Sequence, residues 1–208
     1  MGRRFVAGSA GALELLLEPP AGTAPRAVVV LCHPHPLYGG SLRNKVVDYL
    51  ARTCRERGLA SIRFNFRGVG ASEGVYDEGR GETEDLAAVR RWAGAQPGLS
   101  GLPLWLAGFS FGGAIAWRAA RQEAPARLIT VAPAVRLLAG SERATPRGPD
   151  CPWLLIQGWD DEVVSPQAVL DWAGRQRPPP RLVTPDGVGH FFHGRLNLLR
   201  QLLLEHID

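Results

Sequence analysis

The 208-residue chain is 45% hydrophobic and carries 24 Lys and Arg residues against 20 Asp and Glu residues, a formal net charge of +4. This length and apolar content are enough for one sizeable core, so we expect a single domain over residues 1–208. The basic residues, all arginine except Lys45, are spread along the chain and interleaved with acids. Such spacing is typical of a solvated surface, so we expect no nucleic-acid partner.

The cysteines indicate the cellular compartment, and the apolar runs indicate whether the chain crosses a membrane. Cys32, Cys54 and Cys151 have no paired spacing, which indicates neither a disulfide framework nor a zinc site. A reducing compartment fits this pattern, and we expect a cytoplasmic protein. No run of about 18 uninterrupted apolar residues is present, so no membrane span or membrane partner is expected. The mildly apolar N-terminus is interrupted by Glu14 and lacks a small-residue cleavage site, which favours a folded strand pair over a signal peptide.

After this strand pair, short apolar runs alternate with amphipathic stretches. The β-branched run 27–32 is typical of a strand buried on both faces, and the stretch 41–58 repeats apolar residues at helical spacing. Further strands are expected over 59–66, 102–109, 126–133, 152–158 and 180–185, and further helices over 81–95, 111–123, 165–176 and 195–207. Strand and helix in this order predict an α/β fold, a mostly parallel sheet with helices on both faces. The loop 134–150 is expected to depart most from the pattern.

Residues 108–112, GFSFG, form a G-x-S-x-G motif between a predicted strand and a predicted helix. A sharp strand-to-helix turn holds the middle residue in a strained conformation, and its neighbours must lack a Cβ because backbone passes close by. The N–H groups at the start of the helix favour negative charge at the same place. We therefore interpret Ser110 as a nucleophile; a serine that merely caps the helix is the alternative.

A serine nucleophile needs a base to take its proton and a carboxylate to orient that base. Behind a G-x-S-x-G motif, the acid and then the histidine should each follow a later strand. Asp161 comes after the strand expected over 152–158, and His190 comes after the strand expected over 180–185. The chain order and both strand-end positions therefore predict a triad of Ser110, Asp161 and His190.

Neighbouring residues compete for two of these roles. Asp160 adjoins Asp161, and the spacing from the preceding strand-end glycine favours Asp161 as the acid. Asp160 and Glu162 are then expected to be solvated. His193 follows His190 by one turn, and we interpret it as a hydrogen-bonding or surface residue.

The tetrahedral intermediate of acyl transfer also needs two N–H donors. One is expected from Phe111, the residue after the serine, and the other from the loop after the first long strand. The two prolines of that loop have no N–H, so His35 is the best candidate, with Leu37 or Tyr38 behind it.

Two other motifs suggest a bound group and are interpreted as structural. The stretch HPHP, residues 33–36, could offer a metal pair, but no cysteine or acid clusters with it and its prolines restrict the backbone. The stretch RGVGAS, residues 67–72, lacks the third glycine of a dinucleotide loop and the Lys-Ser/Thr of a Walker loop. We expect no metal and no cofactor, and a structural role for Arg67.

These segments together resemble the α/β-hydrolase superfamily, and within it the small uncapped dienelactone-hydrolase-like and esterase-like bacterial proteins. The resemblance spans nearly the whole chain and is carried by LCHPHPLYGGSLRNKVV, FNFRGVGASEG, GFSFGG, QGWDDEVV and GHFFHG. It implies a Ser110–Asp161–His190 triad that hydrolyses an acyl bond. True dienelactone hydrolases carry cysteine at the nucleophile, and dehalogenases and epoxide hydrolases carry aspartate, so the serine disfavours those reactions.

The residues expected around the triad indicate the substrate. The predicted pocket residues are apolar or aromatic: Leu37, Tyr38, Phe109, Trp159 and Phe191. A pocket of this kind suits a short acyl or aromatic ester, a small-molecule partner. The segment between TVAP and CPWLL is too short for a helical cap domain. We expect a serine carboxylesterase; the alternative is a non-catalytic α/β-hydrolase-fold protein that binds a ligand or partner, which the complete triad disfavours.

Overall fold

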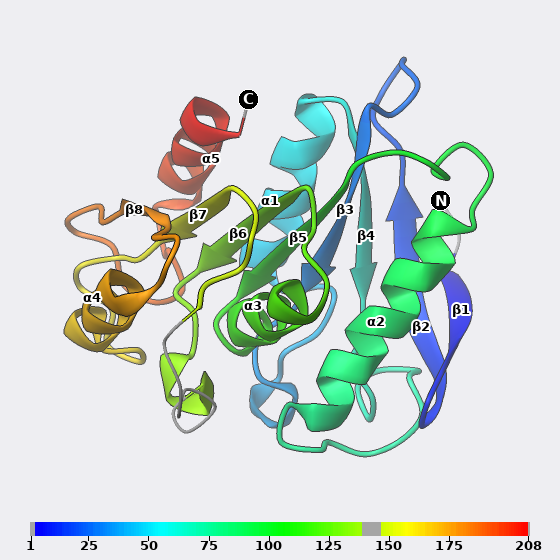
Figure 1. Ribbon diagram of the computed structural model, residues 1–208, viewed down its shortest axis with the longest axis horizontal. Coiled ribbons are helices and arrows are strands. Elements are labelled where there is room, and N and C mark those ends of the chain that lie inside the picture. Colours follow the sequence, from blue (N-terminus) through cyan, green and yellow to red (C-terminus); the bar gives the residue numbers. More distant parts are fainter. Residues whose placement is uncertain (1–2, 139–146, 208) are drawn as a thin grey trace.

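The computed structural model describes residues 3–138 and 147–207 of the chain (Figure 1). The strands are β1 (Arg3–Gly8), β2 (Gly11–Glu18), β3 (Ala27–Cys32), β4 (Leu59–Phe64), β5 (Leu104–Phe109), β6 (Arg127–Val131), β7 (Trp153–Ile156) and β8 (Arg181–Val183). The helices are α1 (Lys45–Glu56), α2 (Arg80–Gly94), α3 (Phe111–Gln122), α4 (Pro166–Arg175) and α5 (Leu196–His206), with short 3₁₀ turns η1 (Pro36–Tyr38) and η2 (Val135–Leu138).

The strands form one sheet in the order β1-β2-β4-β3-β5-β6-β7-β8. From β4 across to β8 all neighbours are parallel, while β1, β2 and β4 pair antiparallel at one edge. The predicted α/β fold with a mostly parallel sheet is confirmed, and so is the N-terminal strand pair. Glu14, which interrupts the apolar pattern of β2, is buried and accepts a hydrogen bond of 2.8 Å from Asn65 Nδ2.

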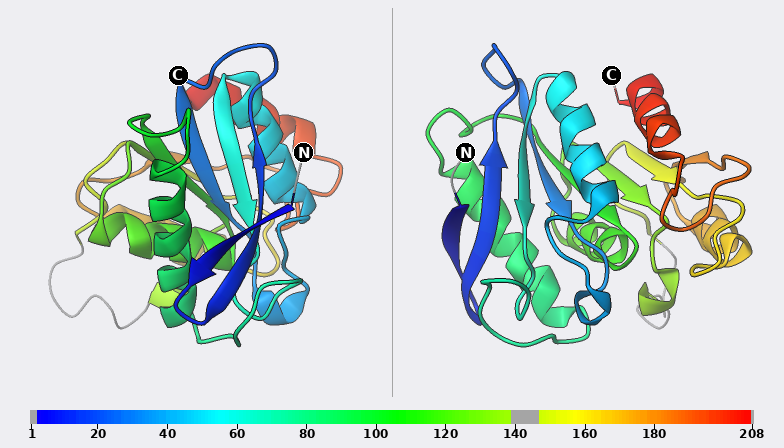
Figure 2. Two further views of the ribbon diagram at one scale, coloured as in Figure 1. Left: turned by 90° about the vertical axis from the view of Figure 1, so that its right-hand side faces the viewer. Right: turned by 180° about the vertical axis from the view of Figure 1, so that it is seen from behind.

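Helices cover both faces of the sheet. Figure 1 shows α2 and α3 in front of it, and the rear view in Figure 2 shows α1 and α5 behind it. All residues of β3 are buried because its side chains alternate between these two layers. Val28 and Val30 pack in the core under α2 and α3, whereas Val29 and Leu31 pack in the core under α1 and α5.

The first helix begins later than predicted. The spacing of apolar residues predicted a helix from residue 41, but α1 starts at Lys45. The side chain of Asn44 accepts hydrogen bonds from the N–H groups of Val46 and Val47, at 3.0 and 3.3 Å, and so caps the helix. Residues 41–44 therefore belong to the loop that follows β3.

Parallel strands end at one edge of the sheet, and the loops that follow them meet there. The loops after β3 and β4 lie at the bottom of the view in Figure 1. Residues 139–146 of the loop 134–150 lie outside the described residues, so the expectation for that loop stays untested over this stretch. Within residues 3–138 and 147–207, no helix combines the length and the apolarity that a membrane crossing requires.

Candidate active site

Ser110 occupies a strained turn between β5 and α3. Its φ and ψ are 54° and −118°, a conformation that costs a non-glycine residue free energy. A Cβ on Gly108 would collide with the carbonyl of Gly112, and a Cβ on Gly112 would collide with the carbonyl of Cys32. The Ser110 N–H donates to the Val131 carbonyl at 2.9 Å, which ties the turn to β6. The flanking positions therefore require glycine, as the motif predicted.

His190 lies between Ser110 and Asp161. Its Nε2 is 3.1 Å from Ser110 Oγ, and its Nδ1 is 2.8 Å from Asp161 Oδ2. A carboxylate can only accept, so Nδ1 carries the proton of the neutral ring and Nε2 is left to accept from the serine hydroxyl. The imidazole is 2% exposed, and the ring of Phe109 packs 4.9 Å from it. The structure thus brings together the three side chains predicted as a triad.

Asp161 is buried and fully hydrogen-bonded. Its Oδ1 accepts from the N–H groups of Val163 and Val164 at 2.9 and 2.7 Å, and Oδ2 accepts from Gln157 Nε2 at 3.0 Å as well as from His190. Burial by itself raises the pKa of Asp161, but the hydrogen bonds that it accepts outweigh burial and lower the pKa below its ordinary value. The carboxylate is therefore ionised at neutral pH and can hold the imidazole in one orientation.

Asp160 differs from Asp161 in its exposure and in its hydrogen bonding. Its side chain is exposed and makes no hydrogen bond or ion pair with another residue in the described part of the chain. The geometry therefore favours Asp161, as expected.

Glu162 has a contact that the sequence did not indicate. Its side chain is exposed, as expected of a solvated acid, but Oε2 accepts from the backbone N–H of His190 at 3.1 Å. This bond joins the loop after β7 to the loop that carries the histidine. His193 is exposed, and its ring stacks on Phe191 with centroids 5.7 Å apart, which agrees with a surface role.

The loop after β3 presents the N–H groups considered for the oxyanion. The Leu37 N–H donates to His35 Nδ1 at 3.2 Å, and the Tyr38 N–H donates to the His35 carbonyl at 3.1 Å, so both alternative donors are already engaged. In the described part of the chain, no group accepts from the N–H of His35 or from that of Phe111. The rings of these two residues lie 5.0 Å apart.

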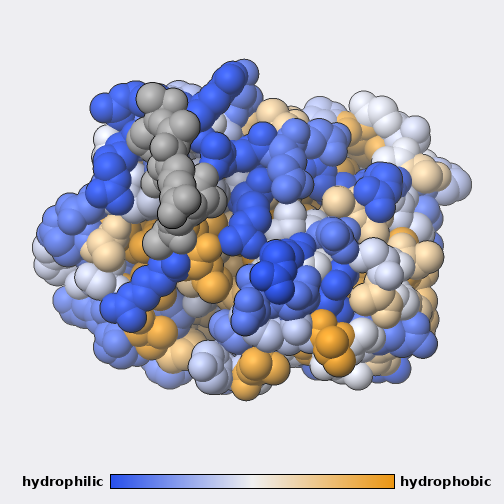
Figure 3. Space-filling view, turned by 60° about the horizontal axis from the view of Figure 1, so that its bottom comes forward, coloured by the Kyte–Doolittle hydropathy of each residue, from blue (hydrophilic) through white to orange (hydrophobic). Residues whose placement is uncertain are grey.

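The predicted pocket residues separate into an exposed set and one core residue. The exposed set lies on the loops after β3, β7 and β8: Leu37, Tyr38, Trp159 and Phe191. Figure 3, which turns this edge forward, shows hydrophobic groups set among hydrophilic ones. Phe109 is 0% exposed, which corrects the prediction that it lines the pocket. As the last residue of β5, it faces the core under α1 and α5, and its ring packs against the imidazole of His190.

A separate hollow of about 910 Å³ lies at the opposite edge of the sheet. It is lined by residues near the amino ends of the parallel strands, among them Leu17, Ala60 and Leu99, and it contains no triad residue. The hollow is therefore separate from Ser110, His190 and Asp161, which lie at the other edge.

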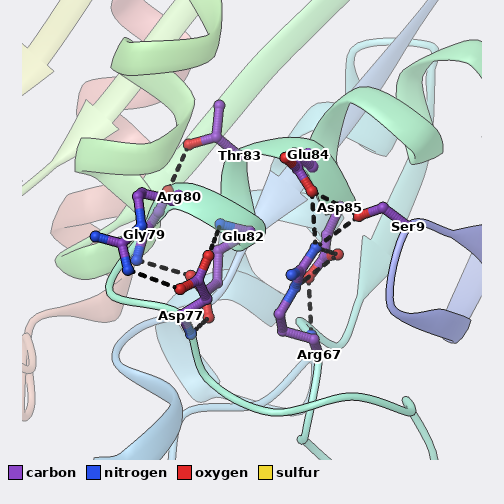
Figure 4. A network of polar contacts seen from close by, with 10 residues as sticks. Ser9, Arg67, Asp77, Gly79, Arg80, Glu82, Thr83, Glu84 and Asp85 are labelled. Atoms are coloured by element: carbon purple, nitrogen blue, oxygen red, sulfur yellow. Dashed lines mark hydrogen bonds and ion pairs between the residues drawn. The ribbon is translucent and has the colours of Figure 1, made fainter.

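Arg67 has the structural role expected of it. Its Nη2 lies 2.8 Å from Asp85 Oδ1, and its backbone N–H donates to Asp85 Oδ2 at 2.9 Å (Figure 4). Asp85 is fully buried on α2, so this ion pair connects the loop after β4 to that helix. A Cβ at Gly81 would meet the Arg67 guanidinium, so a larger residue there would have to displace this side chain from Asp85.

Both ring nitrogens of His33 are used inside the fold. Nδ1 donates to the Pro34 carbonyl at 2.6 Å, and Nε2 accepts from the Phe66 N–H at 3.1 Å. Burial lowers the pKa of His33 to about 4, with the bond to Pro34 partly offsetting it, so the ring is neutral. Within residues 3–138 and 147–207, no three His, Cys, Asp or Glu side chains gather as metal ligands would.

This buried histidine predicts a loss of stability in mild acid. Between pH 6.5 and about 4 the unfolded chain binds a proton at His33 that the folded chain does not, so the free energy of unfolding falls as pH falls. The loss attributable to His33 over this window is about 3 kcal/mol. Urea unfolding at several pH values should show that His33→Gln, whose amide can still accept from Phe66, removes this part of the slope. His193→Gln, at an exposed histidine, should keep the slope; an unchanged slope in His33→Gln would contradict the assignment.

The fold and the site geometry define an α/β-hydrolase of the serine hydrolase class, with no cap domain in the described part of the chain. The family model of X-Pro dipeptidyl-peptidases (S15 family) matches residues 15–148, and the chain belongs to this family. The expected membership of an uncapped α/β-hydrolase group is confirmed. The finer resemblance to dienelactone hydrolases stays a prediction.

Three relatives extend this comparison. The protein RP471 of Rickettsia prowazekii is 32% identical over 82% of this chain and 74% of its own length. An alpha-beta serine hydrolase homologue from Coxiella burnetii is 43% identical, with a TM-score of 0.92 over 100% of this chain and 97% of that one. XC6422 from Xanthomonas campestris, an α/β serine hydrolase without a lid, is 40% identical, with a TM-score of 0.89 over 99% of this chain and 93% of that one.

Proposed function

We propose that the protein is a carboxylesterase that cleaves small acyl esters through an acyl-enzyme on Ser110. The observation that carries this proposal is the continuous chain of hydrogen bonds from Ser110 Oγ through His190 to Asp161, at 3.1 and 2.8 Å. A serine hydroxyl becomes a nucleophile when an oriented base accepts its proton. In these hydrogen bonds His190 is the base, and Asp161 fixes its orientation.

The reaction runs in two halves. Ser110 Oγ attacks the ester carbonyl while its proton passes to His190 Nε2, and the tetrahedral oxyanion accepts from the N–H groups of Phe111 and His35. The intermediate collapses, the C–O bond to the alcohol breaks, and the imidazolium returns its proton to the leaving oxygen. Water then attacks the acyl-enzyme, with His190 again as base, and releases the carboxylic acid and free Ser110. Asp161 stays ionised throughout and stabilises the imidazolium.

The side chains on the loops near Ser110 support this substrate class. The exposed side chains on the neighbouring loops, Leu37, Tyr38, Trp159 and Phe191, are apolar or aromatic, which suits an acyl chain or an aromatic ester group. We propose this small-molecule ester as the partner of the protein, with no nucleic-acid or membrane partner. For the compartment we propose the cytoplasm, since Cys32, Cys54 and Cys151 are all free thiols.

A comparison of ester and amide substrates tests this proposal. The family description favours a second candidate, release of an X-Pro dipeptide from a peptide by cleavage of the amide bond that follows proline. p-Nitrophenyl acetate, butyrate and octanoate should be hydrolysed with kcat/KM far above that for Ala-Pro-p-nitroanilide. The reverse order would replace the esterase by the dipeptidyl-peptidase. A protein inert to both series and to a fluorophosphonate would instead be the non-catalytic binding protein.

A further inference from the structure

Tyr76 touches the two residues assigned to the oxyanion and has no role in the mechanism above. It lies in the loop between β4 and α2, and its Oη is 3.2 Å from His35 Nε2. Its ring centroid lies 5.0 Å from that of His35 and 5.9 Å from that of Phe111. The hydroxyl therefore contacts the side chain of His35, whose backbone N–H is the proposed second donor to the oxyanion.

The hydrogen bonds of His35 determine the direction of this contact. The Leu37 N–H donates to Nδ1 at 3.2 Å, so Nδ1 carries no proton and the neutral ring is protonated on Nε2. Nε2–H then donates to Tyr76 Oη. Burial lowers the pKa of His35, which keeps the ring in this neutral form. The imidazole is consequently held at both nitrogens, one within its own turn and one by Tyr76.

The loop that carries Tyr76 is itself fixed by a buried acid. Glu82, in the first turn of α2, accepts from the N–H of Asp77 at 2.9 Å and from the N–H of Gly79 at 2.7 Å (Figure 4). Arg118 from α3 donates to the Gly79 carbonyl at 2.9 Å. Glu82 is 0% exposed, so these bonds form away from competing water. Tyr76 therefore stands next to a rigid segment and can act as a fixed anchor.

We propose that Tyr76 is a positioning residue: by holding the His35 ring, it keeps the His35 N–H in place for the oxyanion. This inference rests on the proposed function, because it concerns the second donor of that reaction. A donor stabilises developing charge best when it needs no reorganisation as the charge appears. Loss of the hydrogen bond from His35 to Tyr76 should thus destabilise the transition state more than it weakens the binding of the ester.

Tyr76→Phe tests this, because it removes the hydroxyl and keeps the ring contacts. For p-nitrophenyl butyrate we expect kcat to fall about five- to tenfold while KM changes by less than about twofold. The affinity for a boronic acid, which forms a tetrahedral adduct on Ser110, should fall by the same factor as kcat. His35→Asn keeps an acceptor for the Leu37 N–H but loses the donor to Tyr76. Its effect on kcat should not add to that of Tyr76→Phe in the double variant.

Tyr49→Phe, on α1, is the matched control and should leave both constants unchanged. Equal kcat and equal boronate affinity in Tyr76→Phe and the wild type would overturn the inference while leaving the esterase proposal intact. A rise in KM or a lower melting temperature at unchanged kcat would also overturn it, because Tyr76 would then be a substrate contact or a purely structural residue. Wild-type protein that neither hydrolyses esters nor binds the boronate would remove the proposed function and this inference with it.

Discussion

Ser110→Ala is expected to lower kcat for p-nitrophenyl butyrate by on the order of 10⁶-fold, the loss that follows removal of a triad serine. Ser110 Oγ lies 3.1 Å from His190 Nε2. Among the described residues, no other hydroxyl is hydrogen-bonded to this imidazole. Alanine fits the space of the serine and meets the same strain at φ 54°, so the fold should persist. Steady-state kinetics, with circular dichroism on the same samples, measure both effects.

Ser100→Ala offers a matched control. Ser100 is exposed in the turn before β5, on the side of the sheet away from the site, and its substitution should leave kcat/KM unchanged. A folded Ser110→Ala variant that retained most of the wild-type rate would show that another group performs the attack.

Asp161→Asn is expected to lower kcat by on the order of 10⁴-fold, because an amide favours the wrong imidazole tautomer and cannot stabilise the imidazolium. The carboxylate accepts from His190 Nδ1 at 2.8 Å, and it also accepts from Gln157 Nε2 and from the backbone N–H groups of Val163 and Val164. An asparagine must present either its oxygen or its NH₂ group to each of these partners, so it cannot satisfy them all. The structure therefore predicts a loss of rate and of stability together.

A substitution at the adjacent Asp160 distinguishes a catalytic effect from a general effect of removing a negative charge. Asp160→Asn removes the same charge from an exposed side chain and should leave kcat within about twofold of the wild type. Kinetics on the two variants, each with a thermal melt, give the comparison. Equal losses in both variants, or the larger loss in Asp160→Asn, would mean that the acid of the triad has been assigned to the wrong residue.

The fold and the convergence of Ser110, His190 and Asp161 were predictable because local chemistry constrains them strongly. The β-branched run of β3 and the alternating run of β4 leave few alternatives to buried strands. The N-terminal strand pair was expected because Glu14 interrupts the apolar stretch there, and the structure shows the pair to be antiparallel. The glycines around Ser110 are required by backbone contacts that any strand-to-helix turn of this kind makes. Asp161 and His190 follow because parallel strands bring their carboxyl ends to one edge.

The contacts that were missed depend on how separate loops meet. Phe109 was expected in the pocket, yet the side to which a strand's last residue points depends on the register of the whole sheet. The bond from the His190 N–H to Glu162 joins the loops after β7 and β8. The contact of Tyr76 with His35 joins the loops after β3 and β4. No short-range pattern in the sequence reports such pairs.

Labelling with a fluorophosphonate tests most directly whether Ser110 is an activated nucleophile. Phosphonylation requires a serine whose proton is removed by a base, so an inert hydroxyl does not react at the same rate. Mass spectrometry of the intact wild-type protein should show a single adduct, and peptide mapping should place it on Ser110. Asp160→Asn should label as the wild type does, and Ser110→Ala should not label. An unlabelled wild-type protein, or an adduct on another residue, would contradict the assignment of Ser110 as the nucleophile.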